Sequence, residues 1–222
     1  MIQANTRGRL TAGDLQLVVL LLSRGSAHRR ASIERRLATE GPDGLLDSPE
    51  LLERLLTVRT MLVPSETLFF YVLVRHALRR AEVDDRDLAD YLAALLLEFG
   101  QRDRAWRVDW NDDQRHRYLV DILTDLEATD GARRFKVMVH LGNYALWLAG
   151  LFPDYIAARH LRKGGPDVRY YDALGRRGYG MASDHALAEA YGLEAVLRTA
   201  AERYPEVREA LNGVSDRVFG SH

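Results

Sequence analysis

Two histidines lie in apolar stretches of the sequence, where a neutral imidazole could bind a metal or haem or transfer a proton. His76 follows Val72 by four positions and His140 follows Val137 by three, so both are expected on buried helix faces. Neither belongs to a Glu-x-x-His or His-Glu-x-x-His pattern. A metal site would therefore depend on residues that only folding brings together, and the candidates are His76, Asp90, Glu98 and His140. The alternative is that both histidines are core residues bonded to a carbonyl group.

The segment from His140 to Tyr179 carries five of the ten tyrosines of the chain. Asp172 and Arg176 are four residues apart on a predicted helix, so they can pair, and Tyr179 falls on the same face. The preceding predicted helix carries a stripe of polar and aromatic side chains. A few polar groups on an aromatic wall are typical of a ligand pocket. We therefore predict a ligand-binding site lined by His140, Asn143, Tyr144, Trp147, Tyr171, Asp172, Arg176 and Tyr179.

The same segment also has a purely structural interpretation. Gly175 and Gly178 share one face of the predicted helix. A glycine inside a helix costs about 1 kcal/mol relative to alanine, so its presence needs a reason. Close approach of a neighbouring helix is one such reason, and tyrosine hydroxyls would then satisfy buried carbonyl groups. Both interpretations stay open at the level of sequence.

A run of acids, Asp84-Asp85-Arg86-Asp87-x-x-Asp90, resembles the aspartate-rich magnesium motif of class I prenyl-transfer and terpene-synthase enzymes. That resemblance covers seven residues and implies an all-helical enzyme that holds Mg²⁺ against a diphosphate. No convincing second metal motif follows in the sequence. Acids at a helix start are also expected from capping and from the helix dipole, and we favour this explanation.

The elements that would position these residues are all predicted to be helices. Capping residues, Gly or Pro stops and apolar periodicity mark their ends. The predicted helices cover about 11–25, 27–40, 49–60, 65–81, 85–99, 112–128, 132–151, 154–161, 167–191, 193–203 and 205–218. No alternating strand pattern and no repeat of solenoid period is found.

The predicted fold class is all-α, a single globular domain of about ten helices. The helices at about 65–81 and 132–151 are apolar on most sides, so we expect them at the centre with amphipathic helices around them. Residues 1–10 are polar and are predicted to be a flexible N-terminus, with residues 11–222 forming the domain. A chain of 222 residues can bury a substantial core.

The charge balance disfavours several kinds of partner. The chain has 31 Lys and Arg against 32 Asp and Glu, a net charge of −1, so nucleic acid is not expected as a partner. Seven arginines against three acids fall in the first 40 residues, but no aromatic residues alternate with those on the second helix, as a single-strand binder would need. The sequence has no cysteine, no signal-peptide pattern and no apolar run of membrane-span length. We expect a cytoplasmic protein without a membrane partner.

The strings LGNYALWLAGLFP and YYDALGRRGY resemble a pattern found in uncharacterised bacterial all-helical proteins. In that pattern a Gly-x-Tyr helix ends in Gly-Leu-Phe-Pro and is followed by Tyr-Tyr and Gly-Arg. The surroundings of Tyr71-x-x-x-Arg75-His76 and of Asp90-Tyr91 are similar too. The resemblance covers about half the chain and implies membership only, because no activity or catalytic residue comes with it.

These observations lead to two main functional hypotheses, besides a less favoured third one, a nucleic-acid-associated regulator that uses the basic second helix. The first is a non-enzymatic protein that binds a small ligand or a protein partner through the 140–179 region. The second is a metal- or haem-dependent enzyme built on His76 and His140 with nearby carboxylates. The sequence identifies no cofactor and leaves the formation of a homo-oligomer open.

Overall fold

The computed structural model describes residues 2–57, 63–218 and 220 of the chain. The described residues form thirteen α-helices and two short 3-10 helices and contain no strand, which confirms the all-α prediction. In the N-terminal half the elements are η1 (Arg7–Arg9), α1 (Ala12–Ser23), α2 (Ala27–Glu40), α3 (Asp43–Leu46), α4 (Pro49–Thr57), α5 (Glu66–Arg80), α6 (Arg86–Phe99) and η2 (Arg104–Trp106). In the C-terminal half they are α7 (Leu119–Ala128), α8 (Gly131–Leu151), α9 (Pro153–Lys163), α10 (Val168–Ser183), α11 (Ala186–Ala190), α12 (Glu194–Glu202) and α13 (Tyr204–Val218).

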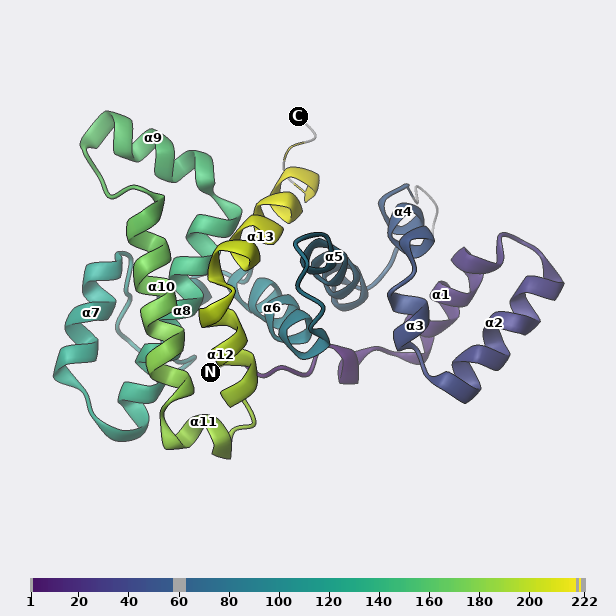
Figure 1. Cartoon of the computed structure of the whole chain (residues 1–222), viewed down its shortest axis with the longest axis horizontal. Helices are drawn as coiled ribbons and strands as arrows, with labels where there is room; N and C mark the ends of the chain where they lie inside the picture. The colour runs from purple at the N-terminus through teal and green to yellow at the C-terminus, as the bar shows by residue number, and fades with distance from the viewer. Residues whose placement is uncertain (1, 58–62, 219, 221–222) are drawn as a thin grey trace.

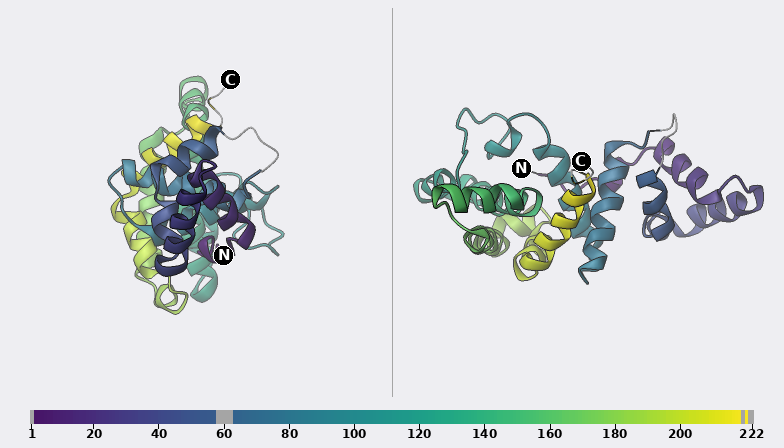
Figure 2. Two further views of the ribbon diagram at one scale, coloured as in Figure 1. Left: turned by 90° about the vertical axis from the view of Figure 1, so that its right-hand side faces the viewer. Right: turned by 90° about the horizontal axis from the view of Figure 1, so that it is seen from above.

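The helices follow one another along an elongated molecule. Helices α7 to α13 form one end, α5 and α6 occupy the middle, and α1 to α4 form the other end (Figures 1 and 2). One cluster of buried apolar side chains extends from α1 to α13, so the two ends share a core. The prediction that α5 and α8 are buried is confirmed, and α6 between them is buried over most of its length as well.

Helices α8 and α10 approach each other closely because both carry glycine at the contact. A Cβ atom on Gly178 would lie 2.6 Å from the backbone nitrogen of Gly142 and 2.9 Å from the carbonyl oxygen of Met138. Next to this contact, the hydroxyls of Tyr91 on α6 and Tyr179 on α10 each donate a hydrogen bond of 2.8 Å to Oδ1 of Asn143 on α8. One buried amide oxygen therefore joins three helices.

The predicted flexible N-terminus lies against α6 where the structure describes it. Ile2 is buried, and the hydroxyl of Thr6 donates to the backbone oxygen of Asp90 at 2.9 Å. The backbone nitrogen of Arg7 donates to the Asp90 carboxylate at 2.6 Å, and the Arg7 guanidinium pairs with Asp87. Asp85 caps the first turn of α6. Three of the acids that resemble a magnesium motif, Asp85, Asp87 and Asp90, are thus engaged in capping or in contacts with the N-terminal segment.

A second charged cluster joins the turn before α4 to α5 and α6. The guanidinium of Arg75 is almost fully buried and pairs with Asp47 at 2.8 Å and with Asp84. Arg86 also binds Asp47, at 2.7 Å. Burial alone would raise the pKa of Asp47, but the hydrogen bonds from Arg75 and Arg86 outweigh it and lower the pKa to about 2.

Two predicted helices differ clearly from the structure, each for a local reason. The helix predicted to begin near 112 begins at Leu119, because the Asp121 carboxylate accepts the backbone N–H groups of Arg117 and Tyr118. Tyr118, which directly precedes α7, is 51% exposed. The helix predicted over 167–191 divides into α10 and α11, where His185 caps the new helix. The short α3 was not predicted, and the predicted end of α4 near 60 lies outside the described residues.

Replacement of Gly178 by alanine tests the contact between α8 and α10. The added Cβ would meet backbone atoms that cannot rotate away, so Gly178→Ala should lower the free energy of unfolding by about 1–3 kcal/mol. The matched control is Gly180→Ala in the same helix, where nothing lies within 4 Å and alanine should stabilise by up to about 1 kcal/mol. Urea denaturation measures both. Equal stability of the two variants would contradict the close contact.

Candidate functional site

The predicted aromatic stripe on α8 is present as a stack of rings. The centroids of His140 and Tyr144 are 5.9 Å apart with an interplanar angle of 17°, and those of Tyr144 and Trp147 are 6.1 Å apart at 22°. Phe99 at the end of α6 packs against both ends of this stack, 5.8 Å from His140 and 5.9 Å from Trp147. The Tyr144 hydroxyl donates a hydrogen bond of 2.8 Å to the carbonyl oxygen of Arg117. The stack therefore anchors the segment that precedes α7.

His140, at one end of this stack, has surroundings that disfavour its charged form. It is buried, and its Nε2 has no hydrogen-bond partner among the described residues. Burial, followed by the nearby charges of Arg104 and His116, holds the pKa of His140 well below its ordinary value. The His116 ring is 6.3 Å away and its own Nε2 lies 3.2 Å from Asp125.

His76 has entirely different surroundings from His140. Its Nε2 lies 3.2 Å from the carbonyl oxygen of Leu46, the contact expected of a core histidine. Burial, only partly offset by this contact, lowers the pKa of His76. The two histidines share no contact, and the candidate carboxylates Asp90 and Glu98 are engaged with Arg7 and Arg104. Within the described ranges, no three His, Cys, Asp or Glu side chains lie together in a metal-binding group.

The polar residues predicted on α10 point in different directions. Tyr179 is completely buried against Asn143, whereas Arg176 is exposed. Asp172 forms its ion pair with Arg208 of α13, at 3.1 Å, rather than with Arg176. Asp172, Arg176 and Tyr179 therefore do not form one polar face toward the stack, because α10 turns its glycine and tyrosine side toward α8.

Tyr171, one of the predicted set, lines a surface cavity. Two cavities of about 280 Å³ and about 480 Å³ adjoin here and share Tyr118 and Arg159 in their walls. We call them together the α9 groove. The residues lining it are Arg117, Tyr118, Leu119, Val120, Leu148, Tyr155, Ala158, Arg159, Arg162, Lys163, Pro166, Tyr170 and Tyr171.

The α9 groove carries positive charge without any acid in its walls. Its cations are Arg117, Arg159, Arg162 and Lys163, and no Asp or Glu lines either cavity. None of the four forms an ion pair with a carboxylate in the part of the chain that the structure describes. Arg117 instead covers the ring of Trp106 at 4.9 Å, and Arg159 covers that of Tyr118 at 5.2 Å.

Local structure positions the groove residues. Pro153 begins α9, and Ile156 is the one side chain of this helix that is buried. Gly164, at a φ of 60°, ends the helix in a left-handed conformation that favours glycine. The next residue, Gly165, lies under Arg159, since a Cβ there would be 3.1 Å from the Arg159 side chain. The Gly164–Gly165 turn therefore brings Arg159 against the groove wall.

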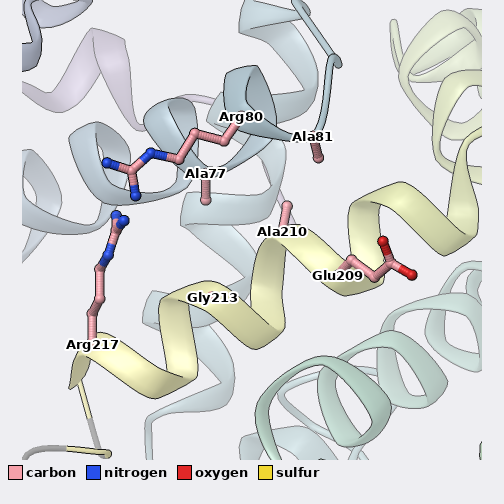
Figure 3. Close-up of a pocket in the computed structure, with 7 residues that line it drawn as sticks. All are labelled: Ala77, Arg80, Ala81, Glu209, Ala210, Gly213 and Arg217. Atoms are coloured by element: carbon pink, nitrogen blue, oxygen red, sulfur yellow. The ribbon is translucent and has the colours of Figure 1, made fainter.

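Two other surfaces have unbalanced or dense positive charge. A cavity of about 240 Å³ between α5 and α13 has an alanine and glycine floor, and Arg80 and Arg217 point toward one another across one end (Figure 3). Glu209 lies at its other end, and no aromatic residue lines it. On α2 the basic residues are largely neutralised, as in the pairs Arg30–Glu34 and Arg36–Glu40.

Comparison with family models, curated proteins and solved structures gives no match. Among the described helices, none is both long and apolar enough to cross a bilayer. The class of the molecule is therefore defined by its own geometry, an all-helical protein with a basic, aromatic groove along α9.

The sequence contains one local signal for the groove. Tyr155 and Arg159 are four residues apart on the helix predicted over about 154–161, and Arg162 follows directly after its predicted end. No local signal identified Tyr118, because its exposure depends on the late start of α7.

The buried state of His140 predicts how stability depends on pH. Its pKa is depressed in the folded protein and near 6.5 when unfolded, so the unfolded chain takes up the proton first as the pH falls below about 6.5. Stability should therefore decrease by about 1 kcal/mol between pH 6.5 and 5.5 through this residue. In His140→Phe, which keeps a ring in the stack, that contribution should disappear. Urea unfolding at each pH measures it, and identical pH slopes for the two proteins would refute a neutral His140.

Proposed function

We propose that this protein is a non-enzymatic ligand-binding protein and that the α9 groove binds an anionic ligand. The observation that carries the proposal is the gathering of four cations around a groove with no acid in its walls, on a chain whose net charge is −1. Like charges at one site repel each other, and an anion that enters the groove relieves this repulsion.

The helix dipole accounts for the position of two of the four cations in the α9 groove but not of the other two. Arg162 and Lys163 lie in the last turn of α9, where cations interact favourably with the helix dipole. Arg159 is a full turn earlier, and Arg117 comes from a different segment. The dipole gives no reason for these two guanidinium groups to share the groove, whereas a bound anion does.

The residues predicted from the sequence take indirect roles in this proposal. Tyr171 forms a wall of the groove, and Tyr144 positions Arg117 through its hydrogen bond. The alternative of a metal- or haem-dependent enzyme has less support, because His76 and His140 contact different residues and face different surroundings. A cytoplasmic location, expected from the lack of cysteine, belongs to the same proposal.

Calorimetric titration with inorganic tripolyphosphate at low salt tests the proposal. The protein should bind this anion, and Arg159→Gln combined with Arg162→Gln should weaken binding by at least about tenfold, because charge-assisted hydrogen bonds are lost. The matched control is Arg80→Gln combined with Arg217→Gln, which removes the same charge from the cavity between α5 and α13. Absence of binding, or equal loss in both double variants, would overturn the proposal.

A further inference from the structure

We infer that the ligand of the α9 groove is a single-stranded nucleic acid, whose bases stack on the exposed tyrosines while its phosphates contact the cations. This inference rests on the proposed function and adds the chemistry of the ligand. It concerns a local surface, so it is compatible with the balanced charge of the whole chain, which argued against nucleic acid as a partner.

The groove gathers three exposed tyrosine rings. Tyr118, Tyr155 and Tyr170 are 51%, 54% and 38% exposed. They come from three separate elements, the segment before α7, helix α9 and the first turn of α10, and all line the same groove. Outside the groove, Tyr91 and Tyr179 are completely buried, and Tyr191 is exposed on a different surface. Three accessible rings at one groove form a platform for flat ligands.

Rings and cations alternate within the groove. On α9 the cations Arg159 and Arg162 follow Tyr155 on one helix face, and the Arg159 guanidinium also covers the Tyr118 ring. Proteins that bind single strands combine a basic path for the backbone with aromatic rings for the bases. The basic helix α2 lacks this alternation, and three of its four arginines, Arg29, Arg30 and Arg36, are paired with glutamates.

The geometry favours a single strand over a duplex or a lipid surface. In a duplex the faces of the bases are covered by their neighbours, so the three tyrosines would have no stacking partner. A helix that lies on a membrane directs its apolar side toward lipid. Helix α9 instead packs its buried Ile156 against the protein and directs its cations into a concave groove.

The number of cations limits the size of the contact. Four cations can neutralise about four phosphates. For single strands, each neutralised phosphate contributes about −0.7 to the slope of the logarithm of the binding constant against the logarithm of salt concentration. We therefore expect a slope of about −3 for the logarithm of the binding constant against the logarithm of salt concentration. A contact of about four nucleotides is at the short end of known single-strand sites.

Fluorescence anisotropy of a labelled oligo(dT) of twelve nucleotides, titrated with the full chain, tests the inference. Binding should follow the expected salt slope, and Tyr155→Leu combined with Tyr170→Leu should weaken it by at least about tenfold through loss of stacking. Far-UV circular dichroism should show that this variant is folded, so that a loss of binding reports the rings and not unfolding. The matched control is Tyr191→Leu, because Tyr191 is 49% exposed but lines no part of the groove.

The other possible results distinguish a failure of the inference from a failure of the proposed function. Binding of tripolyphosphate together with oligo(dT) binding that does not depend on the tyrosines overturns the inference and leaves the proposed function standing. Equal affinity for a duplex of the same length, or tyrosine-dependent binding to phosphatidylserine vesicles without binding to oligo(dT), also overturns it. If neither tripolyphosphate nor oligo(dT) binds, the inference and the proposed function both fail.

Discussion

The close contact between α8 and α10 is the constraint on which the C-terminal half of the molecule depends. Gly142 and Gly178 bring the two backbones together, and Asn143 beside them accepts hydrogen bonds from tyrosines on α6 and α10. The amide oxygen of Asn143 accepts both of the hydrogen bonds that it can form. Loss of Asn143 or of either tyrosine hydroxyl would leave a buried polar group unpaired and would lower the free energy of unfolding. Because this contact sets the position of α10 along α8, it also brings the start of α10, with Tyr170 and Tyr171, beside the segment that Tyr144 anchors.

The segment from His140 to Tyr179 thus divides into an inner and an outer part. Its inner residues, among them His140, Asn143 and Tyr179, are buried and hold helices together. Its outer residues on α9 are exposed and carry charge that the fold does not neutralise. Elsewhere several arginines are paired with carboxylates, among them the almost fully buried Arg75, which binds Asp47 and Asp84. Unpaired cations beside exposed rings therefore distinguish the α9 groove from an ordinary solvated surface.

Much of the fold could be predicted because its signals are local. The capping box of Thr11 and Asp14, the Ser65 cap before α5 and the apolar repeat of α6 each act within a few residues, and the structure contains all three. The groove could not be predicted in the same way, because its rings and cations come from segments about 40 residues apart. The exposure of Tyr118 depends on two contacts, the hydrogen bond from its backbone nitrogen to Asp121 and the hydrogen bond from Tyr144 to the carbonyl oxygen of Arg117. Helical periodicity in the sequence indicates neither contact.

The sequence by itself therefore determined the fold class, most helix positions and which two helices are apolar enough for the centre, since hydrophobic spacing and end-capping are properties of short segments. It also identified the 140–179 region as rich in glycine and tyrosine. Only the tertiary structure showed which roles these residues have. The glycines serve helix contact, Asp172 pairs with α13, and the polar aromatic surface lies on α9 rather than on the face of Asp172 and Arg176. The face of a helix that is exposed to solvent depends on which helices pack against it. That packing depends on contacts over the whole chain and not on the local sequence.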